Sequence, residues 1–210
     1  MVFGHHGIAA SSGTANTHQP MALLSKSAKA AISGGGGGFF RPSKIVSGTT
    51  VRFALLSEEP VEGWELWADG PDKAKAFRWD HEPTPAEIDA TLGDYTRRMN
   101  REGTGFDPMK FFMALPIYNY DTGRVEVMEL NQKILIRELD SISQSDDWNV
   151  LECDFTLGKT GAMLTTEYKL LPANRKKGSD EVLADAWAEV QAAGFDLSKV
   201  LEDGGNPFRP

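Results

Sequence analysis

Two alternating runs in residues 110–130 constrain the fold of this chain more than any other feature. Lys110–Tyr120 places apolar side chains on both alternating faces, and Arg124–Leu130 repeats the alternation. Asp121-Thr122-Gly123 lies between the runs, and Asp and Gly are favoured in tight turns. The pattern predicts a β-hairpin of two long strands, and therefore a protein built on a sheet.

Shorter runs of the same kind predict further strands on both sides of this hairpin. A helix is expected from Asn131, an N-cap residue, with apolar positions at Ile134, Leu135, Leu139 and Ile142. One helix followed by a last pair of strands is the element order of an OB-fold. We therefore expect a mainly β protein with helical additions, a β-barrel of the OB-fold type. The further strands are predicted at 51–56, 64–67, 75–79, 151–157 and 164–171, with the last two joined by a turn at 158–161.

Composition shifts along the chain predict three parts. Residues 1–44 are rich in Gly, Ser and Ala and include five consecutive glycines, so we expect a flexible arm. Residues 45–173 form the expected OB-fold domain, and residues 174–210 the expected C-terminal helix and acidic tail. A helical insert is predicted over 84–101, because Thr84 and Glu87 form a capping box.

Two finer expectations concern the arm. Ser25–Ile32 has the composition of a short helix, and Met21 is a plausible native start, so residues 1–20 are interpreted as an upstream extension.

The residues that usually perform catalysis or bind metals are scarce. Cys153 is the single cysteine, which excludes a disulfide within the chain and any multi-cysteine metal site. Of the four histidines only His81 lies in the expected folded region. We expect no catalytic residues, no metal and no cofactor. No apolar run reaches the roughly 18 residues that span a bilayer, so no membrane partner is expected.

Two short motifs have a structural interpretation. Gly158-Lys159-Thr160 is similar to the end of a phosphate-binding loop, but Cys153 occupies the position where that loop needs its first glycine. We interpret it as a hairpin turn with an exposed lysine. Asp121-Thr122-Gly123 matches the aspartic-protease triplet, yet its place between two strands favours a turn.

Charge and aromatic residues indicate a nucleic-acid ligand. The net charge is −8, but residues 1–60 carry a net +3 and residues 179–210 a net −5, so a local basic groove is compatible with the total. Phe112, Tyr118 and Tyr120 share a strand face with Lys110, and we expect these rings to be exposed. Single-stranded nucleic acid binds in this way, with bases stacked on rings and phosphates paired with cations.

The candidate residues fall into two groups. Phe77 and Trp79 share a strand face, so an alternative places both inside and leaves Arg78 alone in the groove. Bases are expected to stack on Trp64 or Trp67, Trp79, Phe112, Tyr118 and Tyr120. Phosphates are expected to contact Arg52, Lys75, Arg78, Lys110, Arg124, Lys159 and Lys169.

Four segments of the chain resemble the single-stranded DNA-binding proteins of tailed bacteriophages. They are Phe112–Tyr120, Gly123–Lys133, Cys153–Leu157 and Thr166–Pro172, and the resemblance covers about residues 48–172. It implies an OB-fold that binds and protects single-stranded DNA, irrespective of sequence, in phage DNA replication, recombination or repair. The implied location is the cytoplasm of the infected bacterial host. The insert at 84–101 and the glycine-rich arm have no counterpart in this pattern.

The last residues resemble the acidic tails with which such proteins recruit replication or recombination proteins. Glu202, Asp203 and Phe208 carry this likeness, although Arg209 and Pro210 follow the phenylalanine. The alternative is that Phe208 packs on the domain.

Two other function classes stay open. One is a structural or virion-associated protein-interaction module on an OB-like barrel. The other is a nuclease, for which Asp146-Asp147 would have to bind Mg²⁺.

Overall fold

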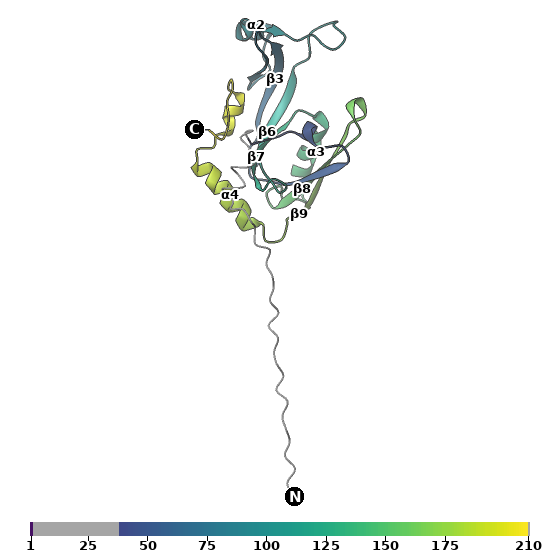
Figure 1. The fold of residues 1–210 in the computed structure, drawn as a ribbon, viewed down its shortest axis with the longest axis vertical. Helices are drawn as coiled ribbons and strands as arrows, with labels where there is room; N and C mark the ends of the chain where they lie inside the picture. Colours follow the sequence, from purple (N-terminus) through teal and green to yellow (C-terminus); the bar gives the residue numbers. More distant parts are fainter. Residues whose placement is uncertain (2–37, 210) are drawn as a thin grey trace. The chain divides into compact units, whose positions relative to one another are not determined.

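The computed structural model describes residue 1 and residues 38–209. The expectations for Ser25–Ile32 and for residues 1–20 lie outside the described residues. The residues from 38 onward belong to one compact unit, which is mainly β (Figure 1). Nine strands form one sheet that does not close into a barrel, and three α-helices accompany it in the described part.

The strands follow each other in the order β1-β7-β6-β2-β8-β9 across the sheet, and β3 to β5 branch from β6. Their bounds are β1 Phe39–Phe40, β2 Thr49–Leu55, β3 Val61–Asp69, β4 Ala74–Trp79, β5 Thr96–Arg97, β6 Lys110–Asn119, β7 Arg124–Leu130, β8 Cys153–Thr160 and β9 Glu167–Asn174. The helices are α2 Pro85–Leu92, α3 Lys133–Ser143 and α4 Asp180–Ala192, with 3₁₀ turns η1 Pro42–Lys44, η2 Met163–Thr165 and η3 Leu197–Leu201.

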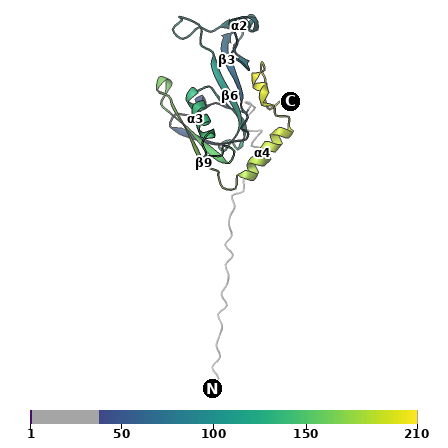
Figure 2. The same ribbon diagram turned by 180° about the vertical axis from the view of Figure 1, so that it is seen from behind.

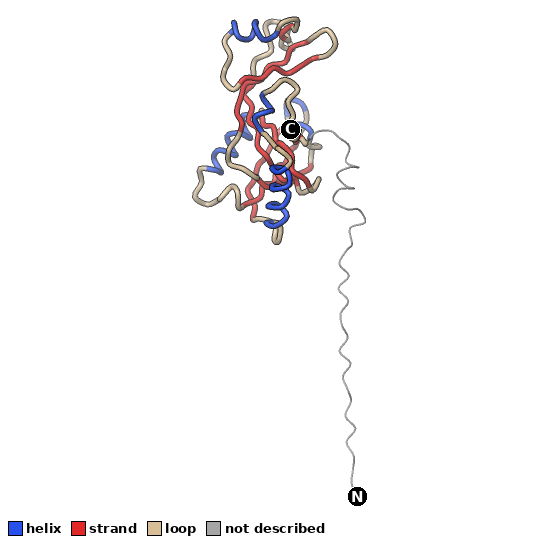
Figure 3. Tube along the Cα trace, turned by 90° about the vertical axis from the view of Figure 1, so that its left-hand side faces the viewer, coloured by secondary structure: helices blue, strands red, loops and turns tan. Residues whose placement is uncertain are grey.

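Strand β6 organises this sheet because three strands bond to it. One edge pairs with β7 over the predicted hairpin, which is confirmed, with Gly123 at φ +66° in its turn. The other edge is divided, since its first half pairs with β3 and its last residues pair with β2. The β3–β4 hairpin therefore extends away from β2, and Figure 3 shows it as an upper extension of the body.

The main core lies between the inner face of this sheet and α3. Phe53 and Phe155 stack with ring centroids 5.5 Å apart, and Leu135 and Leu139 of α3 are buried with them. Glu138 accepts a hydrogen bond from the backbone N–H of Leu170, so α3 is tied to β9. The helix also contacts β7. It thus lies against β7 and β9, which stand at the two ends of the β7-β6-β2-β8-β9 part of the sheet.

The C-terminal helix is confirmed, and it covers the opposite face of the sheet. Leu183 of α4 packs with Tyr118 and Val125, while Val200 of η3 packs with Phe112. Figure 2 shows α4 and α3 on opposite sides of the body. The described part of the C-terminal segment, residues 174–209, therefore belongs to the packed domain.

The predicted helical insert over 84–101 is correct only in its first half. The capping box is present, since Thr84 Oγ1 accepts from the Glu87 N–H at 3.4 Å and the Glu87 carboxylate accepts from the Thr84 N–H at 2.7 Å. The helix ends at Leu92 because Gly93 adopts φ +54°. The chain then returns as β5, where Thr96–Arg97 pairs with β3.

Three smaller expectations were also wrong. Gly158-Lys159-Thr160 belongs to strand β8, and the turn lies at residues 161–166. Phe39–Phe40 pairs in parallel with β7, so the folded body starts before residue 45. The N-cap of α3 is Gln132, one residue after the predicted Asn131.

We predict that Leu139→Ala lowers the free energy of unfolding by about 2–5 kcal/mol, because it removes buried methyl groups from the core. Urea unfolding followed by circular dichroism measures this change. Ile134→Ala on the same helix is the matched control, since its side chain is 53% exposed and the change should stay within about 0.5 kcal/mol. Equal losses in the two variants would contradict the orientation of α3.

Candidate nucleic-acid interface

A cleft of about 160 Å³ lies between the β3–β4 hairpin and the segments around the end of β7. This volume is below the roughly 300 Å³ of common small-molecule pockets, so it suits one planar group better than a whole cofactor. Its lining residues are Arg41, Ser43, Lys44, Glu65, Trp67, Arg78, Phe112, Glu129, Asn131 and Gln132.

Trp67 supplies the flat ring of this cleft. Its side chain is half-buried, and its indole Nε1 donates to Glu65 Oε1 at 2.9 Å, which fixes the ring orientation. The guanidinium of Arg98 lies over the ring, 5.4 Å from the centroid, and its Nε donates to exposed Asp69 at 2.7 Å. An aromatic face beside a cation is the arrangement that receives an unpaired base and its phosphate.

Arg78 connects the hairpin to the rest of the domain at the back of the cleft. It donates to Glu65 Oε2 through Nε and Nη2, and through Nη1 to the Val200 carbonyl of η3. Its Nη2 also lies 2.8 Å from Glu129 Oε1, an ion pair without hydrogen-bond geometry. Burial alone would lower the pKa of Arg78, but Glu129 and Glu65 raise it overall, so the group stays charged.

The other charges of the cleft favour an anionic ligand. Arg41 donates to Glu129 Oε2 at 2.7 Å, yet nearly half of its side chain is exposed. Lys44 is exposed and forms no ion pair with the residues that the structure describes. The cations among the lining residues therefore exceed the two carboxylates by one.

One of the residues that line the cleft also carries an unpaired polar atom. Gln132 Oε1 is buried and finds no hydrogen-bond partner within residues 38–209. Because a buried polar atom without a partner is costly, this oxygen is a site for a donor group from a ligand or water.

Phe112 and Tyr118 are buried and cannot stack on a base, so the expectation that these two rings are exposed was wrong. Phe112 is 2% exposed and Tyr118 is 8% exposed. Their face of β6 is the one covered by η3 and α4. The cause is therefore tertiary packing by a segment more than sixty residues later in the sequence.

The remaining predicted rings are half-buried and differ in their surroundings. Trp64 packs edge-on against Phe111 at 5.8 Å, and Trp79 packs on the small core of the hairpin with Phe77. The alternative that placed Phe77 and Trp79 inside and left Arg78 alone in the groove is correct in its first part only. Both rings pack on the hairpin core, whereas Arg78 shares the cleft with Trp67, Arg41 and Lys44. The Tyr120 hydroxyl donates to Asp154 at 2.9 Å, and its oxygen lies 3.1 Å from the Ser179 hydroxyl. Of the predicted rings, Trp67 and buried Phe112 line the cleft.

The predicted phosphate contacts divide into paired and unpaired cations. Arg52, Lys75, Arg78 and Arg124 form ion pairs with Asp154, Asp203, Glu65 and Glu126 respectively. Lys159 donates to the Ser43 carbonyl at 2.8 Å, which places it next to the cleft. Lys110 is exposed and pairs in register with Glu65, and Lys169 is exposed on β9.

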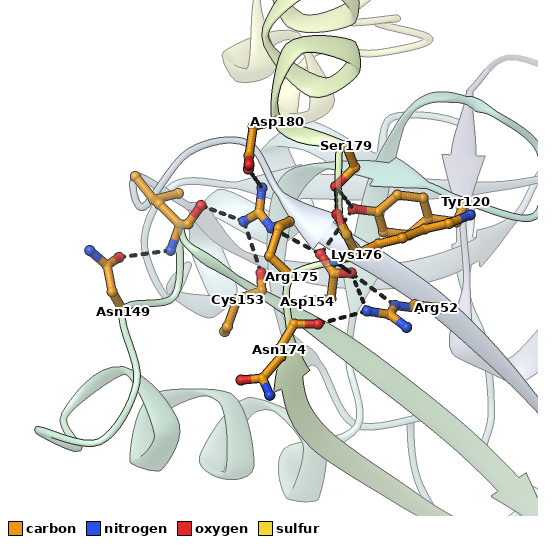
Figure 4. A network of polar contacts seen from close by, with 11 residues as sticks. Arg52, Tyr120, Asn149, Cys153, Asp154, Asn174, Arg175, Lys176, Ser179 and Asp180 are labelled. Carbon is orange, nitrogen blue, oxygen red and sulfur yellow. Dashed lines mark hydrogen bonds and ion pairs between the residues drawn. The ribbon is translucent and has the colours of Figure 1, made fainter.

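Arg52 belongs to a buried network that serves packing (Figure 4). The carboxylate of Asp154 is fully buried and accepts from Arg52 Nε at 2.8 Å and from the Lys176 N–H at 3.0 Å. Arg175 Nε lies 3.0 Å from the other carboxylate oxygen. Burial raises the pKa of Tyr120, so its hydroxyl stays protonated and donates to the same carboxylate. This network holds the start of α4 against β8.

The tail residues lie in two environments. Phe208 packs against Phe195 with ring centroids 5.2 Å apart, and a Cβ added to Gly38 would lie 2.9 Å from its ring. The alternative that Phe208 packs on the domain is confirmed. Glu202 is exposed, and Asp203 is exposed while it pairs with Lys75 at 2.5 Å.

Sequence reasoning missed four polar or charged residues that line the cleft, namely Arg41, Lys44, Asn131 and Gln132. Arg41 and Lys44 were assigned to the arm, although Pro42 and Ile45 beside them are buried. The apolar pair Phe39–Phe40 was the available signal that the arm ends earlier.

Within the described residues, no group of His, Cys, Asp and Glu is arranged to hold a metal ion. No helix there has the length and apolar character required to cross a membrane. No family model, curated protein or solved structure matches the chain.

We predict that Asp154→Ala lowers the free energy of unfolding by about 3–5 kcal/mol, because it leaves two arginines without their buried partner. Chemical denaturation measures the loss. Asp180→Ala is the matched control, since this carboxylate is 82% exposed, lies 3.8 Å from Arg175 and should contribute at most about 1 kcal/mol. A small effect of Asp154→Ala would show that the network does not hold α4 in place.

Proposed function

We propose that this chain binds single-stranded DNA without sequence preference and without catalysis, through the cleft around Trp67. The observation that carries the proposal is the indole of Trp67, oriented by Glu65 and flanked by Arg98, in a cleft that also contains Arg41 and Lys44. Rings bind bases of every type because each base has a π-face, and cations bind the phosphates.

The size of the cleft favours unpaired bases over a duplex. A volume of about 160 Å³ admits one ring at a time. In a duplex the base faces are covered by their stacked neighbours, so a base must be unstacked before Trp67 contacts it, at a cost of a few kcal/mol. In a single strand the bases are unpaired, so the free-energy cost of exposing one base face to Trp67 is smaller than in a duplex.

The sheet topology supports an OB-fold as part of the same proposal. Without β1 and the branch formed by β3 to β5, the strands follow the order β7-β6-β2-β8-β9, with α3 between β7 and β8 along the chain. Helix α3 lies where an OB barrel has its helix, against the strands at both ends of that order. Four predicted matches to phage single-stranded DNA-binding proteins fall on β6, on β7 and the start of α3, on β8 and on β9.

The biological role that we propose follows from that resemblance. It is protection of single strands in phage DNA replication, recombination or repair in the cytoplasm of the infected host. Glu202 and Asp203 are exposed and stay candidates for contacts with replication or recombination proteins, whereas packed Phe208 is not.

We expect Trp67→Ala to weaken binding of single-stranded oligonucleotides about 5- to 150-fold, to the same extent for all base compositions, since one stacked base contributes about 1–3 kcal/mol. Titration followed by fluorescence anisotropy of a labelled oligonucleotide measures this loss. Trp67→Phe keeps a ring and should retain most of the affinity. A loss confined to one base composition would contradict the proposed mode of contact.

We expect affinity to fall steeply between about 50 and 200 mM salt, because phosphate binding releases counterions. Lys44→Ala should reduce the slope of log affinity against log salt by about one. Lys177→Ala removes an exposed lysine outside the cleft and should leave the slope unchanged. No binding to oligonucleotides at any salt concentration would overturn the function and leave the protein-interaction module in its place.

A further inference from the structure

Two apolar side chains extend into solvent at the tip of the β8–β9 hairpin. Met163 and Leu164 lie in η2 and are each 95% exposed. Large apolar residues in a folded domain seldom lie this far from any neighbour, and exposed apolar groups at one site mark contacts with other molecules.

The backbone of the tip holds these side chains in place. Met163 adopts φ +51°, a left-handed conformation that is unfavourable for a non-glycine residue. Gly161 is at φ +70°, where a Cβ would lie 2.0 Å from the Thr165 carbonyl oxygen. Thr165 donates to the Ala162 carbonyl through both its N–H at 3.0 Å and its hydroxyl at 2.9 Å. The turn is therefore ordered, and it presents its apolar residues outward without burying them.

A groove of about 380 Å³ with a matching character lies between the β2–β3 connection and the end of α4. Trp187 and Phe195 pack edge-to-face in it, with ring centroids 5.2 Å apart. Its acidic residues are Glu59 and Asp196, and none of its lining residues is a lysine or arginine. The other apolar residues of the lining are Pro60, Val61, Pro116 and Leu197.

The tip and the groove complement each other in charge and lie on opposite sides of the body. The hairpin ends near the tip carry Lys159, Lys169 and Glu167, a net charge of +1, whereas the groove carries two carboxylates. In Figures 1 and 2 the β8–β9 tip and the end of α4 point to opposite sides. A chain therefore cannot place its own tip in its own groove.

We propose that the Met163–Leu164 tip of one copy docks into the Trp187–Phe195 groove of a second copy. Such a contact joins different surfaces on the two copies, so it leaves a free tip and a free groove and extends head to tail. The consequence of this contact is cooperative binding, because copies joined head to tail lie side by side along one single-stranded DNA. This consequence rests on the proposed function.

The groove is assigned to a protein segment because its two carboxylates repel phosphates. The tip is assigned to the groove because burial of two aliphatic side chains is more favourable against an apolar lining than against single-stranded DNA. Contact of the tip with bases is therefore the competing outcome that the experiments below separate.

Engineered cysteines test the contact directly. Leu164→Cys places a thiol on the tip and Gln191→Cys places one in the groove lining. Burial raises the pKa of Cys153, so the native thiol reacts slowly and adds no cross-link. On long poly(dT) under mild oxidation, the doubly substituted chain should form a ladder of cross-linked species. A mixture of the two single variants should form dimers only.

Two results would overturn the contact. One is the absence of cross-links from variants that bind poly(dT) with native affinity. The other is equally efficient cross-linking of the Leu164→Cys variant with itself.

A second variant separates docking between copies from contact with bases. Met163→Ser with Leu164→Ser should lower cooperativity on long poly(dT) by about tenfold or more, because it removes both docking side chains. Affinity for an oligonucleotide that holds one copy should be unchanged. Leu171→Ser, a 46% exposed site elsewhere on β9, is the matched control and should change neither value.

A fall in affinity for the short oligonucleotide would show that the tip contacts bases, and would overturn the inference. Because the short oligonucleotide reports DNA binding without any neighbour, failure of the proposed function is seen separately, as absence of binding by the native chain.

Discussion

The divided edge of β6 is the constraint on which the rest of the structure depends. Every residue of a strand has backbone groups that need partners, and β6 satisfies one edge with β3 in its first half and with β2 at its end. This division carries the β3–β4 hairpin away from the body and sets Trp67 opposite η1 and the end of β7. Arg78 then joins the parts, since it bonds Glu65 in the hairpin, pairs with Glu129 in β7 and donates to the Val200 carbonyl in η3.

Local sequence predicted the helices and strands well where the apolar residues had a regular spacing and a turn or capping residue marked the end of the element. The hairpin of β6 and β7, helix α3 and helix α4 all have a clear period, and their bounds lie close to the predicted ones. The insert was extended too far because Tyr95 and Met99 continue a helical spacing past Gly93. One glycine at positive φ ended the helix there, and spacing alone does not reveal its conformation.

The candidate site was harder to predict because exposure is decided by distant packing. Phe112 and Tyr118 lie on a strand whose two faces are both apolar, which is the pattern of a strand buried on both sides. The apolar face of α4 is buried against this face of β6, where Leu183 packs with Tyr118. The cleft around Trp67 could not be predicted because Arg41 and Lys44 form part of its lining. Both residues come from a segment that local composition assigned to the arm.

The packing of Phe208 beside Gly38 means that the first and last described segments of the fold meet at one place. A linker between these two positions would therefore be short. A chain in which the same elements follow each other in a permuted order can therefore pack in the same arrangement. The exposed loop at residues 101–104 is a suitable place for the new ends of such a circular permutant.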